Sequence, residues 1–179
     1  MHDDDDEIDY GLGPGLPPPH VLGFQQAATL PTMSSLLLNE ARMLAGGKDY
    51  NGHRLAMILA HAACDVQTEA TMAQLFIARD VRYLHGPLKD LMGNQVSLHL
   101  ERVRKVYSAL SDDDPKTQTW WGTWRDSIAE RNKVAHGGTL TTEAQVSITL
   151  DACRAYVEHL QAVSDRHRPT FSTNPSPSE

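Results

Sequence analysis

Residues 55–76 read LAMILAHAACDVQTEATMAQLF. Apolar side chains recur in and just beyond this stretch at intervals of three and four residues, the spacing that places them on one face of an α-helix. They are Leu55, Ile58, Leu59, Ala62, Val66, Ala70, Ala73, Phe76 and Ile77. We therefore predict one long helix from about Gly52 to Arg79, with this face directed into the core.

The segments on either side have the same helical periodicity. The helix before it ends at Gly46-Gly47, because glycine readily adopts the conformations found at helix ends. Thr142 and Gln145 form a capping box that opens the last helix. The predicted helices other than 52–79 cover about 32–45, 80–85, 96–110 and 117–135, with the last one running from Thr142 onward. Since no strand-like alternation extends beyond a few residues, the fold class is all-α, a bundle of four to five main helices.

Both ends of the chain differ from this helical middle. The first ten residues contain six acids and no Lys or Arg, and Gly and Pro follow them. Like charges repel and prolines block regular structure, so residues 1–30 are predicted to be a disordered tail. Residues 169–179, PTFSTNPSPSE, are predicted to be a flexible tail. One helical domain is expected in between, at 31–168, because 179 residues suit a single domain.

The formal net charge of −7 arises at the ends of the chain. The chain has 23 acids and 16 bases, and seven of the acids lie in the first ten residues or at Glu179. The remainder therefore carries 16 acids and 16 bases. This balance excludes a broadly basic nucleic-acid coat but is compatible with a local basic patch.

The numbers and positions of the cysteines and histidines indicate the compartment of the protein and whether it binds a metal. Cys64 and Cys153 are the only cysteines, and both fall within helical patterns, so we expect buried free thiols and a reducing, cytoplasmic compartment. No signal peptide or membrane-spanning apolar run is recognisable. The nine histidines lack the spacing of metal ligands on a helix, so we expect no metal and no cofactor.

The segment with recognisable chemistry is RNKVAH, residues 131–136, which two glycines follow. Asn132 and His136 share a helix face, whereas Arg131 and His136 lie about 140° apart around a straight helix. The latter pair converges if the helix distorts, if the arginine curls back or if a second copy of the helix faces the first. Arginine binds phosphate bidentately and imidazole exchanges protons near neutral pH, so the pair suits cleavage of RNA by its own 2′-hydroxyl. The structural alternative is that these cations complement the dipole at the end of the helix.

RNKVAH, with Asn after the Arg and two glycines after the His, resembles the signature motif of HEPN domains. The stretch at 55–76 resembles the helix that packs against the motif helix in that family and that often carries an acid directed at the motif. Asp65 and Glu69 are the matching acids. The resemblance covers about residues 34–166. It implies a four- to five-helix bundle that forms a homodimer, in which two motifs meet in one cleft.

The resemblance further implies a metal-independent endoribonuclease of a toxin–antitoxin, CRISPR-linked or phage-defence system. Arg131 would hold the scissile phosphate and His136 would be the acid and base. Asn132 would orient His136 or the RNA, and an acid of the earlier helix would hold Arg131. The catalytic candidates are Arg131, His136 and Asn132, and the supporting candidates are Asp65, Glu69 and Lys133, with no metal.

A second function stays open at this point. Members of the family that have lost catalysis bind nucleotides, RNA or protein partners, so a non-catalytic helical module is the alternative to the ribonuclease. RNA is the expected partner of the enzyme, an antitoxin or other protein is a further one, and no membrane is expected.

Two features outside the motif lead to packing predictions. Trp120 and Trp124 lie on one helix stripe and are predicted to be core residues, whereas Trp121 lies off that stripe and is expected on the surface or at a dimer contact. The acidic run Asp112–Asp114 is expected to be a solvated turn.

Overall fold

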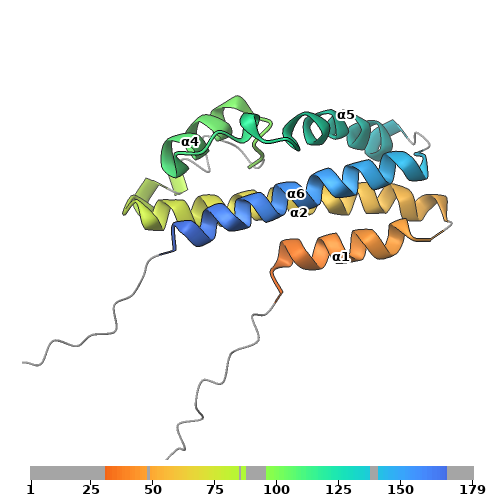
Figure 1. Ribbon diagram of the computed structural model, residues 1–179, viewed down its shortest axis with the longest axis horizontal. Coiled ribbons are helices and arrows are strands. Elements are labelled where there is room, and N and C mark those ends of the chain that lie inside the picture. The colour runs from red at the N-terminus through yellow and green to blue at the C-terminus, as the bar shows by residue number, and fades with distance from the viewer. Residues whose placement is uncertain (1–30, 48, 85, 88–95, 138–140, 169–179) are drawn as a thin grey trace, which may run out of the picture. The chain divides into compact units, whose positions relative to one another are not determined.

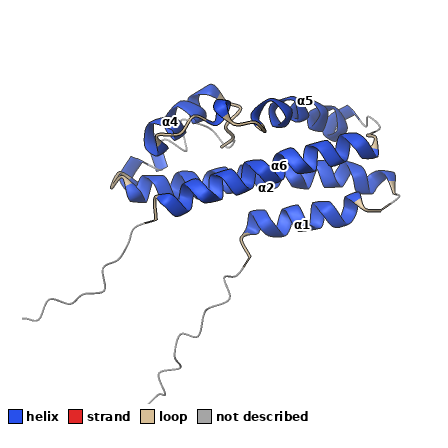
Figure 2. Ribbon diagram, in the orientation of Figure 1, coloured by secondary structure: helices blue, strands red, loops and turns tan. Residues whose placement is uncertain are grey.

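The computed structural model describes residues 31–47, 49–84, 86–87, 96–137 and 141–168. Five α-helices account for most of these residues, and the described part of the chain contains no strand (Figures 1 and 2). They are α1 (Met33–Ala45), α2 (Tyr50–Ala78), α4 (Glu101–Ser111), α5 (Trp121–Gly137) and α6 (Glu143–Arg166), with short 3-10 turns η1 (Arg82–Leu84) and η2 (Pro115–Thr117). The all-α prediction is confirmed. The tails predicted at 1–30 and 169–179 lie outside the described residues.

Hydrogen bonds from side chains fix where two of these helices begin. Thr32 Oγ1 accepts a bond from the backbone N–H of Ser35 at 3.2 Å and thereby caps α1. The predicted capping box of α6 is confirmed, because Gln145 N–H donates to Thr142 Oγ1 and Thr142 N–H donates to Gln145 Oε1. These local signals are readable in the sequence because both partners lie within three residues.

The α2–α6 pair forms the centre of the bundle. Cys64 Sγ lies 3.8 Å from the carbonyl oxygen of Cys153, and Thr71 Oγ1 donates to the carbonyl oxygen of Leu160 at 3.4 Å. Residue numbers rise together along both contacts, so the two helices run parallel. Both thiols are free and buried, as the sequence predicted.

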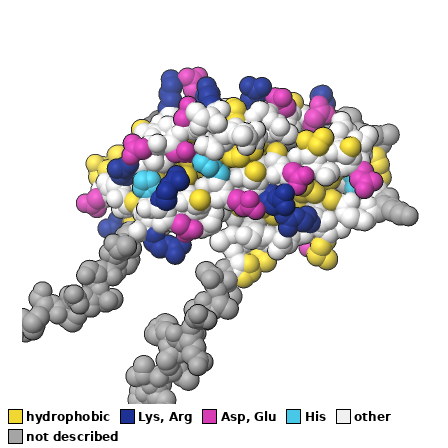
Figure 3. All heavy atoms as spheres, in the orientation of Figure 1, with side chains coloured by type: hydrophobic (Ala, Val, Ile, Leu, Met, Phe, Trp, Pro, Cys, Tyr) yellow, Lys and Arg dark blue, Asp and Glu magenta, His cyan; other side chains and the backbone are white. Residues whose placement is uncertain are grey.

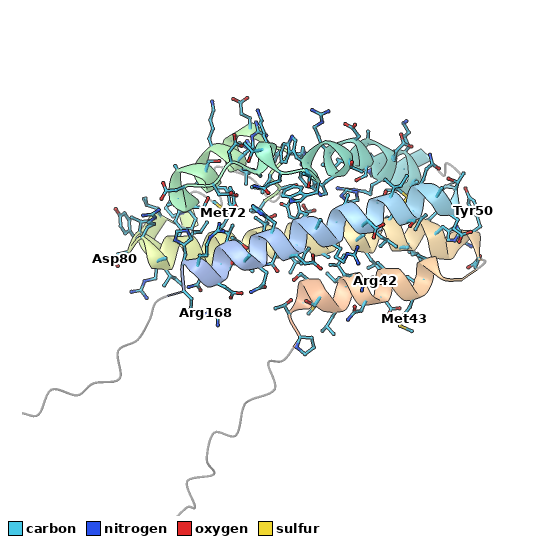
Figure 4. All side chains as sticks on the ribbon, in the orientation of Figure 1. Arg42, Met43, Tyr50, Met72, Asp80 and Arg168 are labelled. Carbon is cyan, nitrogen blue, oxygen red and sulfur yellow. The ribbon has the colours of Figure 1, made fainter. Side chains whose placement is uncertain are left out.

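The other helices pack around this pair. α1 contacts α2 and α6, α5 also contacts both, and α4 contacts α2. Figure 1 shows α1 on one side of the pair and α4 and α5 on the other. Tyr50 lies at the end of α2 beside the beginning of α6, and Asp80 lies just beyond the opposite end of α2 (Figure 4). The α5 helix, which carries RNKVAH, is therefore held on two helices.

An aromatic cluster anchors the start of α5. Trp124 stacks on Tyr156 of α6 with ring centroids 4.5 Å apart, and Trp120 meets the same ring at 5.1 Å. The surface prediction for Trp121 is wrong: its side chain is 8% exposed, and Arg104 of α4 lies 5.5 Å from its ring centroid. The predicted stripe assumed that a helix runs through Trp120 and Trp121. In the structure α5 begins only at Trp121, so helical periodicity does not determine which way this side chain points.

Two further predictions near α4 need correction. The helix predicted at 96–110 begins only at Glu101, because the backbone of Leu100 is extended. The predicted solvation of Asp112–Asp114 is wrong for Asp113. Tyr107 Oη donates to Asp113 Oδ2 at 2.7 Å, and His159 Nε2 lies 2.8 Å from the same oxygen. Tertiary contacts therefore override the local pattern on both sides of α4.

The surface has no strong segregation of charge on the face drawn in Figure 3. Lys and Arg side chains alternate there with Asp and Glu side chains. Within the described residues, no helix has the length and apolar character that crossing a bilayer requires.

Two glycines near helix starts provide a matched test of the packing. A Cβ on Gly52 of α2 would lie 2.9 Å from the carbonyl oxygen of Leu44, whereas a Cβ on Gly122 of α5 would meet nothing within 4 Å. Alanine normally stabilises a helix by up to about 1 kcal/mol relative to glycine. We expect Gly122→Ala to raise the free energy of unfolding by up to that amount. Gly52→Ala should lower it, because α1 and α2 must separate.

Urea denaturation of both variants and the wild type measures these changes. An increase in stability for Gly52→Ala would contradict the described approach of α1 to the start of α2.

Candidate functional site

The site begins with the antiparallel packing of α5 on α2. Ser127 Oγ of α5 lies 3.1 Å from His61 Nε2 of α2, and Arg54 Nη2 of α2 donates to the carbonyl oxygen of Val134 at 3.0 Å. Residue numbers rise along α5 as they fall along α2. The last four carbonyls of a helix lack partners within it, so Arg54 satisfies one of them and attaches the end of α5 to α2.

Polar side chains gather between these two helices and the segment before α4. We call this set the polar cluster. It consists of His61 and Asp65 from α2, Ser127 and Arg131 from α5, and Ser97 and His99 from the segment before α4. Three of its members can carry positive charge, and only Asp65 can carry negative charge.

His61 is a buried, neutral member of the polar cluster. The hydroxyl of Ser127 donates to the carbonyl oxygen of Trp124 at 2.7 Å, so its oxygen accepts from Nε2–H of His61. Burial first, and the charge of Arg131 second, lower the pKa of His61 from 6.5 to about 4. His61 therefore has a fixed tautomer and is 3% exposed, which places it out of reach of a substrate.

Asp65 and His99 are linked through one serine. A hydrogen bond connects the Ser97 side chain to Asp65, and Ser97 Oγ lies 3.0 Å from Nδ1 of His99. Because the serine has a single proton and the carboxylate can only accept, the chain runs from His99 Nδ1–H to Ser97 and from Ser97 to Asp65. Burial raises the pKa of Asp65, while the Ser97 hydrogen bond and then the charge of Arg131 act to lower it.

Arg131 supplies the permanent charge of the polar cluster. Its positive charge lowers the pKa of His61 and His99 and stabilises the ionised form of Asp65. The side chain is half-buried, and its Nε is buried with no hydrogen-bond partner among the described residues. The Nε–H donor of Arg131 is therefore unused among the described residues.

The structure brings together only part of the predicted site. Arg131 and Asp65 both belong to the polar cluster, where the charge of Arg131 acts on Asp65, but no hydrogen bond or ion pair joins these two side chains among the described contacts. Glu69 lies one turn further along α2, is half-buried, and is not one of the described groups that shift the pKa of Asp65. Lys133 pairs instead with Glu130 at 2.7 Å on the exposed side of α5.

His136 and Asn132 lie away from the polar cluster. Both are exposed, in the last turn and a half of α5. The helix remains α-helical through Gly137, so helix distortion does not rotate His136 toward Arg131. The remaining routes to convergence are the reach of the arginine side chain and a second copy of α5.

Sequence reasoning missed Ser97 and His99. They were placed on a helix starting at 96, where residues two apart point about 200° away from each other. In the observed turn their side chains meet. No local sequence signal marks this turn, because Asn94 and Ser97 are both residue types that favour a helix start near 96.

Metal ligation has no support in the described part of the chain. No group of three or more His, Cys, Asp or Glu side chains there is arranged to hold a metal ion. The positive charge of Arg131, which acts on Asp65 and both histidines of the polar cluster, would itself repel a cation.

Comparison of the chain with models of known protein families, with curated proteins and with solved structures finds no match.

The lowered pKa of His61 makes stability depend on pH. The unfolded chain protonates this imidazole near pH 6.5, whereas the folded chain does so only near pH 4, so acid favours unfolding between these values. Between pH 7 and pH 5 we expect the wild type to lose about 2 kcal/mol more than His61→Gln, which cannot titrate. Comparing the two proteins cancels the opposite effect of Asp65, whose pKa is raised.

Urea denaturation at pH 7, 6 and 5 measures this difference, with His53→Gln as the control at a partly exposed histidine. Parallel stability curves for the wild type and His61→Gln would show that His61 is not buried in its neutral form.

Proposed function

We propose that this protein is a metal-independent endoribonuclease of the HEPN type. The observation that supports this most strongly is the state of Arg131. Its positive charge acts on Asp65, its Nε–H has no partner among the described residues, and it belongs to an RNxxxH segment that ends in an exposed histidine. A fixed cation with spare donors next to proton-transfer groups suits reactions at a phosphodiester.

The proposed reaction is intramolecular transesterification of RNA. The 2′-hydroxyl oxygen attacks the adjacent phosphorus, and its proton passes to an imidazole. The bond from phosphorus to the 5′-oxygen breaks, and that oxygen takes a proton from an imidazolium. The products carry a 2′,3′-cyclic phosphate and a 5′-hydroxyl. Arg131 stabilises the negative charge that grows on the phosphate oxygens, a task that needs no metal.

His136 is the proposed acid at the leaving oxygen. It is exposed at the end of α5, and Arg54 fixes that end through the carbonyl of Val134. Because Arg131 and His136 lie on different sides of a straight helix, we propose that the enzyme acts as a homodimer in which the motifs of two copies share one cleft. Asn132, on the same face as His136, orients the imidazole or the RNA.

Binding of RNA is proposed to be local. The mixed surface charge in Figure 3 suits contact with a short RNA segment rather than with a long basic track. A role as a toxin or phage-defence effector, with an antitoxin as partner, is the biological setting that we propose for this activity.

The test is incubation of a mixed RNA pool with the purified protein in EDTA. We expect the wild type to leave 2′,3′-cyclic phosphate ends and EDTA to have no effect. His136→Ala should lower the rate by at least about 100-fold, as is typical when proton transfer is lost. His53→Ala is the matched control and should cleave like the wild type.

Loss of wild-type cleavage in EDTA would contradict the mechanism. RNA binding without cleavage by any of these proteins would favour the non-catalytic module instead.

A further inference from the structure

We propose that His99 is the general base of this reaction and works with Arg131 of the same protomer. This inference rests on the proposed function and adds a catalytic residue that the RNxxxH motif does not contain. It assigns the two proton transfers to different imidazoles, with His99 at the 2′-hydroxyl and His136 at the leaving oxygen.

The first support is the way in which the ring of His99 is held. Nδ1 donates to Ser97 Oγ at 3.0 Å, and Ser97 donates to Asp65. Ser97 is 5% exposed, so this contact is shielded from water. An imidazole whose Nδ1 proton is held in this way presents the lone pair of Nε2, and a base needs that tautomer.

The second support is accessibility. Among the described residues nothing hydrogen-bonds to Nε2 of His99, and this nitrogen is not one of the buried polar atoms that lack a partner. The side chain of His99 is partly exposed. His61 also faces Arg131, but its Nε2 proton is bound to Ser127 and its ring is buried. His99 is the imidazole of the polar cluster that a substrate can reach.

The third support is the charge around His99. Asp65 and His61 face it from α2, and Arg131 faces it from α5. Burial lowers the pKa of His99, Asp65 acts to raise it, and Arg131 lowers it further. The ring is thus neutral at pH 7 and ready to accept a proton. A phosphate bound by Arg131 would lie within the same group of side chains.

The step balances without any further reactant. Nε2 of His99 accepts the proton of the 2′-hydroxyl while the bond between the 2′-oxygen and phosphorus forms. The 5′-oxygen departs with the proton that His136 donates. Proton exchange with water then restores both imidazoles.

A pair of substrates separates the two roles. The first is an RNA oligonucleotide that the wild type cleaves at one linkage. The second is identical except that sulfur replaces the bridging 5′-oxygen at that linkage. A thiolate leaves without protonation, so the sulfur substrate no longer needs a general acid but still needs a base.

The variants are His99→Gln and His136→Ala, each checked for folding by circular dichroism. Glutamine retains an N–H donor for Ser97, so His99→Gln should fold. We expect both variants to cleave the oxygen substrate at least about 100-fold more slowly than the wild type. The sulfur substrate should restore cleavage by His136→Ala and should not restore cleavage by His99→Gln.

Ser97→Ala tests how the ring is held. It keeps the imidazole and removes its orienting partner, so kcat should fall while KM stays near that of the wild type. Removing a general base usually slows a reaction far more than twofold. If His99→Gln cleaves the oxygen substrate within about twofold of the wild-type rate, the role of His99 is overturned. Restoration of His99→Gln by the sulfur substrate would likewise overturn it.

These outcomes separate the two proposals. If the wild type cleaves and His99→Gln cleaves equally well, the ribonuclease stands and the assignment of His99 falls. If the wild type cleaves no RNA, the proposed function is wrong, and the role of His99, which depends on it, is wrong as well.

Discussion

The parallel packing of α2 on α6 is the contact on which the other described helices depend. Cys64 and Thr71 of α2 reach backbone carbonyls of α6, which sets the register of the pair. α5 contacts both helices, and its first turns are anchored by the stack of Trp124 on Tyr156. Because α5 is held in this way, its later turns meet α2 at defined positions. The location of Arg131 is therefore a consequence of the core.

Electrostatic interactions explain why the position of Arg131 is suited to a chemical reaction. One carboxylate, Asp65, shares a partly buried space with Arg131, His61 and His99. Charges in such a space act on each other more strongly than at the surface, because water screens them less. The two imidazoles are kept neutral by burial and by the neighbouring guanidinium, so the positive charge is concentrated on Arg131. With both imidazoles neutral, this charge has Asp65 as its only counter-charge within the polar cluster.

Periodicity and capping signals predicted the long helix, the stop after α1 and the capping box of α6, because those signals are local. The predictions failed where distant partners decide the outcome. Trp121 is buried beside Arg104, and Asp113 is bound by Tyr107 and His159. The same limit applies to the site. The motif and the helix pattern singled out Arg131 and Asp65 only as candidates, and the link from Ser97 to Asp65 and His99 depends on a turn that periodicity interpreted as helix.

The central claim is that Arg131 is the phosphate-binding group of a metal-independent ribonuclease. The most direct test compares Arg131→Gln with Arg125→Gln, an exposed arginine on the same helix that pairs with its neighbour Asp126. The measurement is the rate at which 2′,3′-cyclic phosphate ends form on RNA in the presence of EDTA. We predict that folded Arg131→Gln forms almost none while Arg125→Gln matches the wild type. Equal rates for the two variants would contradict the account.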